Sequence, residues 1–132
     1  MNRFVKSVAD VLETPSLTLD TEFRAVDGWC SLTAFGLLVA LENDWRTPLT
    51  IDRLRALRTV RDLYREAFLS FAARLLGVPR ERLSGETAYG ELAEWDSVNH
   101  LRMVMEAEQA FGTEYPIETV PGLRRLEDWL VE

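Results

Sequence analysis

Histidine and cysteine are nearly absent from the 132 residues, since each occurs once, as His100 and Cys30. A single cysteine excludes a disulfide within the chain, and one histidine makes a zinc or iron centre unexpected. No long apolar run is present, so no transmembrane helix is expected. Arg3, Lys6 and Asp10 interrupt the first eleven residues, which argues against a signal peptide and favours a cytoplasmic protein.

Basic residues are the minority, with 15 Lys and Arg against 22 Asp and Glu, and the net charge is −7. Nucleic acid and anionic membrane are therefore not expected partners. The charge is uneven, because residues 1–66 hold 10 acids and 9 bases, whereas residues 67–132 hold 12 acids and 6 bases. The sequence also lacks a Walker phosphate loop, a paired-glycine nucleotide motif and a His-Glu-x-x-His metal motif.

The second half of the chain repeats the first at an offset of 66 residues. Between the pairs Leu17/Leu83 and Leu63/Trp129 no gap is needed, and 10 of the 47 pairs are identical. Upstream, a gap of two residues aligns the apolar residues of an expected first helix, Phe4, Val11 and Leu12, with Phe68, Leu75 and Leu76. The identical pairs include Trp29/Trp95, Ser31/Ser97, Glu42/Glu108, Ile51/Ile117 and Asp62/Asp128. Two copies of one small fold are expected, copy one at residues 1–65 and copy two at residues 66–132.

The apolar residues of each copy recur at helical spacing, and strand alternation is absent. The fold class is therefore expected to be all-α, with about four helices per copy. Long helices are expected at 31–44 and 97–111, and short helical segments at 51–57 and 117–123. Residues 58–76 contain neither proline nor glycine. The last helix of copy one is therefore expected to continue into the first helix of copy two, without a flexible linker.

Each copy carries a serine where a long loop enters a helix. Ser31 lies in Gly28-Trp29-Cys30-Ser31-Leu32, and Ser97 lies in Glu94-Trp95-Asp96-Ser97-Val98. Serine commonly caps helices, because its hydroxyl accepts a hydrogen bond from a free backbone N–H. A helix start also favours an anion, so a serine there is suited to carrying a phosphodiester. Taken alone, the serine is compatible with both interpretations.

The residues around Ser97 resemble those of the acyl carrier protein family. The family signature is Asp-Ser-Leu at the start of the second helix, followed by apolar residues and a Glu-rich end before Phe-Gly. Copy two reads Asp96-Ser97-Val98 at this point, and its helix ends in Glu108-Gln109-Ala110-Phe111-Gly112. The resemblance spans nearly the whole chain, once per copy. It implies two consecutive four-helix bundles, each with a long first loop.

The resemblance implies that Ser97 accepts 4′-phosphopantetheine from coenzyme A, with Asp96 recognised by the phosphopantetheinyl transferase. The arm would hold an acyl or related group as a thioester. Its partners would be enzymes that load acyl or aminoacyl groups and enzymes that condense or modify them, and the carrier itself would not be an enzyme. Ser31 is a second candidate attachment site, although Cys30 replaces the acid and copy one is nearly neutral. A monomer and a homodimer are both compatible with the sequence.

Two other functions are compatible with these residues. In the first, one or both copies stay unmodified and serve only as docking surfaces. In the second, His100 would act as the base of a serine hydrolase built on Ser97, although the family resemblance makes His100 a surface residue near the arm. Arg102 lies where many carriers have an acid that binds partners, which indicates partners different from those of a general fatty-acid carrier.

The helix that begins at Ser31 has no charged residue as far as Leu41. Since a helix that is apolar all round is usually buried on more than one side, we expect copy two, a second chain or a partner enzyme to cover it. Gly36 in mid-helix is expected to admit another backbone. The residues of the face expected to be covered are Thr33, Gly36, Val39 and Ala40.

Three arginines, Arg58, Arg61 and Arg65, recur at the spacing of one helix face. They are expected either to be solvated or to contact the acidic second copy or a partner. The four tryptophans are expected in the core or at its edge.

Overall fold

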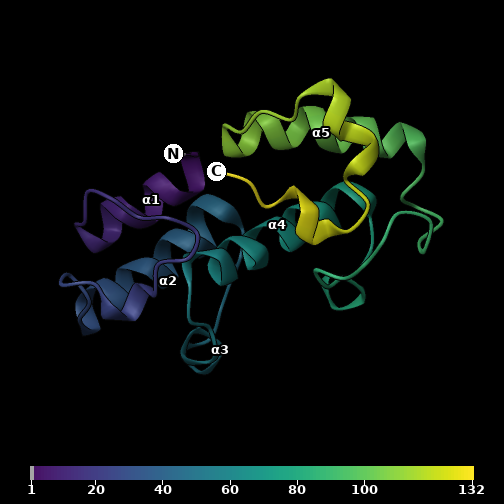
Figure 1. The fold of residues 1–132 in the computed structure, drawn as a ribbon. Helices are drawn as coiled ribbons and strands as arrows, with labels where there is room; N and C mark the ends of the chain where they lie inside the picture. The colour runs from purple at the N-terminus through teal and green to yellow at the C-terminus, as the bar shows by residue number, and fades with distance from the viewer. Residues whose placement is uncertain (1) are drawn as a thin grey trace.

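The computed structural model describes residues 2–132, which form helices joined by loops (Figure 1). The α-helices are α1 (Arg3–Leu12), α2 (Ser31–Trp45), α3 (Ile51–Ala56), α4 (Val60–Leu76) and α5 (Ser97–Phe111). The 3-10 helices are η1 (Phe23–Ala25), η2 (Arg80–Arg82), η3 (Ile117–Gly122) and η4 (Leu126–Trp129). Residues 2–132 contain no β-strand, so the all-α prediction is confirmed. Within this range no helix has the length and apolar character that crossing a membrane requires.

Polar side chains determine where several of the helices begin. Asn2 Oδ1 accepts a hydrogen bond from the Val5 N–H at 2.8 Å, which caps α1. Thr59 Oγ1 accepts one from the Asp62 N–H at 3.3 Å, which caps α4. Each cap satisfies a backbone donor that the first turn of a helix leaves without a partner. The bounds of these helices therefore follow from local sequence.

The elements recur at the offset of 66 found in the sequence. Helices α2 and α5 have 15 residues each and begin at the equivalent residues Ser31 and Ser97. The short helices α3 and η3 also have equivalent bounds. Loop contacts recur as well, because the isolated bridge between Glu22 and Thr59 corresponds to the bridge between Ala88 and Arg125. The repeated sequence thus adopts repeated local structure.

Helix α4 runs from Val60 to Leu76 without a break, as the absence of proline and glycine predicts. It starts at Val60 rather than at residue 58, because Thr59 and Asp62 form a reciprocal capping box. Its first turn matches η4 in the repeat, and its remainder matches α1. The boundary expected between residues 65 and 66 therefore lies inside a single helix, which runs between the α1–α2 pair and α5 (Figure 1).

A single hydrophobic core extends through both copies. Trp45 of α2 stacks on Phe111 of α5, with ring centroids 5.2 Å apart and planes within 10°. These two residues are equivalent in the repeat, so the copies meet through matching positions. Phe68 of α4 packs against Phe111 and Trp129 at centroid distances of 5.6 and 5.8 Å. Such pairs contribute about 1 kcal/mol each beyond the area that they bury.

The tryptophans lie where the sequence predicts. Trp95 and Trp129 are buried, with 1% and 0% of their surface exposed, and Trp29 and Trp45 are half-buried and packed against the core. They therefore fill the core or its edge, as expected.

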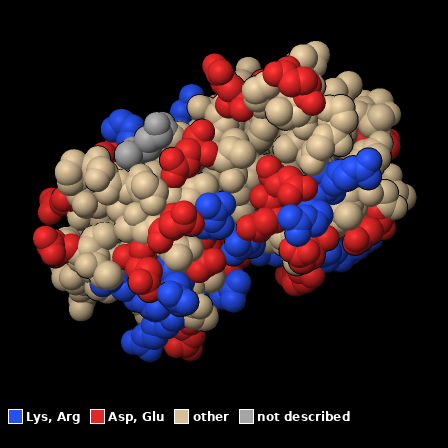
Figure 2. All heavy atoms as spheres, viewed as in Figure 1, with Lys and Arg blue, Asp and Glu red and all other residues tan. Residues whose placement is uncertain are grey.

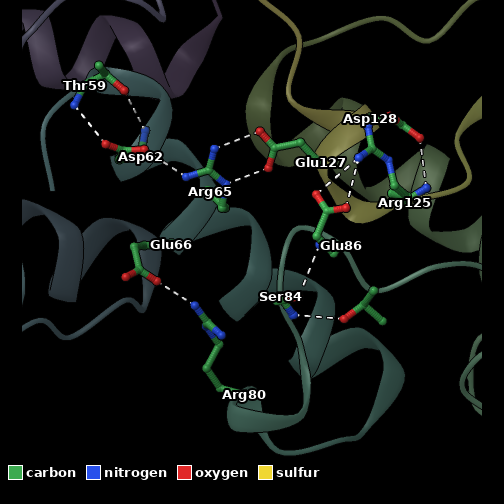
Figure 3. A network of polar contacts seen from close by, with 11 residues as sticks. Thr59, Asp62, Arg65, Glu66, Arg80, Ser84, Glu86, Arg125, Glu127 and Asp128 are labelled. Carbon is green, nitrogen blue, oxygen red and sulfur yellow. Dashed lines mark hydrogen bonds and ion pairs between the residues drawn. The ribbon is translucent and has the colours of Figure 1, made fainter.

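An ion pair on α4 joins the two copies. The Arg65 guanidinium donates from Nε and Nη2 to the two carboxylate oxygens of Glu127, at 2.6 and 2.8 Å (Figure 3). Arg65 therefore makes the contact with the acidic second copy that the sequence suggests. Arg58 and Arg61 instead pair with exposed acids of copy one, Glu22 and Asp20.

The next residue of α4, Glu66, is buried, with 5% of its surface exposed. Its carboxylate accepts from Arg53 Nε of α3 at 2.5 Å and from Arg80 Nη2 of η2 at 2.6 Å. The contact with Arg80 is drawn in Figure 3. Two guanidinium groups compensate the cost of burying the carboxylate, which would be large for an unpaired charge. Glu66 thus links α4 to one element of each copy.

The expected cover over α2 is only partly present. A Cβ at Gly36 would lie 3.5 Å from Val11 Cγ1 of α1, which is an ordinary side-chain contact. Within residues 2–132 no other backbone lies within 4 Å of this Cβ, so the close backbone approach expected at Gly36 is not found within the chain. Of the other residues of the face expected to be covered, Thr33 and Ala40 are half-buried and Val39 is 39% exposed. The neighbouring Leu32 and Phe35 are 78% and 65% exposed. Copy two does not cover them.

Candidate functional site

The serine of copy two, Ser97, is the first residue of α5 and is exposed. The preceding residue, Asp96, is the N-cap: its Oδ1 accepts from the Asn99 N–H at 2.9 Å. Because Asp96 provides the cap, the Ser97 hydroxyl is not needed for it. Asn99 Nδ2 in turn donates to the Glu94 carbonyl at 2.8 Å, which fixes the loop before the helix.

The serine of copy one, Ser31, has the same position at the start of α2 and is also exposed. Its neighbour Cys30 is the N-cap residue and forms a capping box with Thr33: the Cys30 thiol accepts from the Thr33 N–H, and the Thr33 hydroxyl accepts from the Cys30 N–H at 2.9 Å. Hydrogen bonds from Thr33 lower the pKa of the exposed Cys30 thiol. The structure thus places both predicted serines in equivalent positions, with different residues before them.

The loop in front of Ser97 is held by an aromatic cluster. The buried Trp95 donates from Nε1 to His100 Nδ1 at 3.0 Å, and His100 Nε2 lies 3.1 Å from the Val120 carbonyl. With a carbonyl as its partner, Nε2 must be the nitrogen that carries the proton. His100 is half-buried rather than a surface residue, and both ring nitrogens are engaged. This arrangement offers Ser97 no free imidazole nitrogen.

An open groove lies beside each serine. The groove beside Ser97 has a volume of about 480 Å³, and that beside Ser31 about 670 Å³. Each is formed by the start of the serine-bearing helix and by the short helix η3 or α3. Its walls are mostly apolar, with Leu101 and Val120 in copy two and the equivalent Phe35 and Leu54 in copy one. Each groove can therefore receive an apolar group held close to its serine.

The two grooves differ in charge. Arg24 and Arg55 line the groove beside Ser31, and Arg24 Nη1 donates to the Arg55 carbonyl at 2.6 Å. The equivalent positions in copy two are Gly90 and Pro121, and the groove beside Ser97 is lined by one arginine, Arg124. Figure 2 shows basic side chains gathered at and around α3. The surroundings of Ser31 are thus more positive than those of Ser97.

Both serine-bearing helices expose apolar side chains along one stripe. On α5, Val98, Leu101 and Met105 are 66%, 58% and 67% exposed. They are equivalent in the repeat to the exposed residues Leu32, Phe35 and Val39 of α2. Arg102, next to this stripe, is exposed and lies 3.4 Å from Glu106 of the same helix. Each copy therefore presents an apolar surface that starts one residue after its serine.

The sequence identified both serines and Asp96, but not the walls of the grooves. The walls come from short helices whose packing angle depends on the tertiary fold, and their only sequence signal is the pair of apolar residues that face the long helix, Leu54 in α3 and Val120 in η3. Among residues 2–132 no cluster of three or more His, Cys, Asp or Glu side chains could hold a metal ion.

Comparison with known proteins gave no match among protein-family models, curated proteins or solved structures.

Proposed function

We propose that this protein is a tandem carrier, with two acyl-carrier-like four-helix bundles that share α4. Ser97 is the main attachment site for 4′-phosphopantetheine, and Ser31 is the second. Each arm holds an acyl or related group as a thioester, and other enzymes carry out the chemistry. The required partners are a phosphopantetheinyl transferase, coenzyme A as donor, and the enzymes that load and use the arm.

One observation carries this proposal. Two exposed serines occupy the first position of equivalent helices, and each lies beside a mostly apolar groove. A serine at a helix start is accessible to a modifying enzyme, and the dipole favours the phosphodiester that would form there. The groove supplies a place where an attached apolar chain could leave water. The recurrence of the whole arrangement in both copies supports a common role.

The residues before the serines support Ser97 over Ser31 as the main site. Asp96 is exposed at the helix start, where its charge is available to a transferase with a basic docking surface. Copy one has Cys30 at that position, with Arg24 and Arg55 close by, and a basic surface would be less attracted there.

Intact mass spectrometry tests the proposal. The purified chain is incubated with coenzyme A and a broad-specificity phosphopantetheinyl transferase, alongside Ser97→Ala, Ser31→Ala and the double variant. The wild type should gain one or two arms, Ser97→Ala should lose the faster addition, and the double variant should gain none. An unchanged mass of the wild type, or the same additions in the double variant, would refute the proposal.

A docking module is the second candidate function, favoured by the exposed stripe of Leu32, Phe35 and Val39 on α2. In this function copy one binds a partner protein through that stripe and stays unmodified. The same mass measurement distinguishes the carrier function from the docking function, because a copy that serves only for docking gains no arm at Ser31. Phe35→Glu would then weaken binding of the partner without changing the number of arms.

A further inference from the structure

A further groove lies away from both serines, where the two copies meet. Its volume is about 890 Å³, and residues of α3, α4, η2 and the segment after α2 form its walls. Four arginines and two glutamates line it, so its formal charge is positive in a protein whose net charge is −7. The charged residues are Arg46, Arg53, Arg74, Arg80, Glu66 and Glu81.

Only half of this positive charge has an acidic partner. The buried Glu66 binds Arg53 and Arg80, as described above. Within residues 2–132, no carboxylate lies within ion-pair distance of Arg46 or Arg74. Arg74 Nη1 lies 3.5 Å from the Arg46 carbonyl, so the Arg74 guanidinium lies against the backbone of residue 46, and both residues line the groove. Both arginines are exposed, and partial desolvation together with the nearby Arg46 charge lowers the pKa of Arg74.

The backbone at Arg46 adds an independent observation. Arg46 follows the end of α2 with φ of 49°, in the left-handed region that favours glycine. The equivalent residue after α5 is Gly112, with φ of 66°. The cap itself is made by the Arg46 backbone N–H, which donates to the Leu41 carbonyl, so the arginine side chain is not required for it. Copy one therefore holds a charged side chain in the groove at the cost of backbone strain.

From these contacts we propose that the groove binds a small organic phosphate, with the phosphate held between Arg46 and Arg74. Guanidinium groups form paired hydrogen bonds with phosphate oxygens, and a bound dianion would remove the repulsion between the two arginines. This site is separate from the serines and does not depend on an arm being attached.

The rest of the groove indicates what accompanies the phosphate. Its volume is in the range of small-molecule sites, about 300–1,000 Å³, and far exceeds that of a phosphate ion. Pro48, Leu49, Val78 and Pro79 give one part of the wall an apolar character. A ligand with a phosphate at one end and an apolar or planar group at the other would fill both parts.

Isothermal titration of the full chain with sodium pyrophosphate, at low ionic strength, tests the site. The wild type should bind one equivalent in a saturable manner. Arg46→Gly is the most informative variant, because glycine removes the charge and also suits the left-handed backbone. We expect Arg46→Gly to keep or raise the melting temperature while it weakens pyrophosphate binding by about tenfold, as Arg74→Ala should also do.

Arg102→Ala serves as the matched control, because it removes one positive charge from an exposed position on α5. Its pyrophosphate affinity should remain within about twofold of the wild type. Four results would overturn the proposal: no saturable binding by the wild type, wild-type affinity in Arg46→Gly, an equal loss in Arg102→Ala, or binding of a hexaglutamate peptide without binding of pyrophosphate.

Discussion

At the scale of single residues, the residue before each serine is the clearest difference between the two candidate sites. Asp96 caps α5 with its carboxylate, which accepts from the Asn99 N–H. Cys30 offers only a thiol, a weak acceptor, to the Thr33 N–H, and the Thr33 hydroxyl completes this capping box by accepting from the Cys30 N–H. The start of α2 therefore lacks both the charge and the strong cap that the start of α5 has.

Substituting the residue before each serine by its counterpart should change both the stability of the fold and the rate of arm addition at that serine. Cys30→Asp replaces a weak thiol acceptor with a carboxylate and adds a negative charge at the positive end of α2, so we expect the free energy of unfolding to rise by about 1 kcal/mol. The same change should speed arm addition at Ser31. Urea unfolding and a mass time course measure the two effects, and Asp96→Cys should show the reverse at Ser97. Identical stability and identical addition rates in both variants would contradict this view of the caps.

At the scale of elements, the sequence alone was sufficient to predict the bounds of the long helices. The apolar spacing and the loop residues place α2 and α5 within a residue of their observed bounds, and the absence of glycine and proline predicts the continuous α4. The sequence pattern could not predict that η3 and η4 are 3-10 helices rather than α-helices. Pro121 lies inside η3 and cannot donate a backbone hydrogen bond, so this segment cannot form the regular helix seen in α3.

Gly36 provides a test at this scale. It lies inside α2, and a Cβ there would meet only Val11 Cγ1, at the normal contact distance of 3.5 Å. Gly36→Ala should therefore raise the free energy of unfolding by about 1 kcal/mol, because alanine loses less backbone entropy in a helix. Chemical denaturation measures the change. A destabilised variant would show that something approaches the helix more closely than the structure describes.

At the scale of the whole molecule, the copies are fused rather than linked. They share α4, the stacked pair Trp45 and Phe111, and the ion pair between Arg65 and Glu127. The repeat in the sequence indicates two small domains, but it could not reveal that their cores join. The groove of four arginines was equally hidden, since its residues are far apart in sequence and meet only when the copies pack.

The ion pair between Arg65 and Glu127 makes the free energy of unfolding depend on pH. The hydrogen bonds from Arg65 lower the pKa of Glu127 below its ordinary value. A carboxylate with a lowered folded-state pKa stabilises the fold above the pKa of the unfolded residue, about 4.3, and this contribution is lost as the pH falls through the folded-state value. Glu127→Gln should therefore cost about 1 kcal/mol at neutral pH, and the difference should shrink below about pH 4.

Urea denaturation of the wild type and Glu127→Gln at pH 7 and pH 3 measures this change. Glu81→Gln is the matched control, because Glu81 is exposed and forms no ion pair within residues 2–132. A difference for Glu127→Gln that is the same at both pH values would show that the pair contributes through packing rather than charge.

Peptide mapping by mass spectrometry tests the central claim most directly. After reaction with coenzyme A and a transferase, trypsin separates the serines, because Ser97 lies in the peptide 83–102 and Ser31 in the peptide 25–46. We predict one phosphopantetheine arm on peptide 83–102, with fragmentation placing it on Ser97, and slower or smaller modification of peptide 25–46. Both peptides without an arm, or an arm on peptide 25–46 alone, would contradict the account.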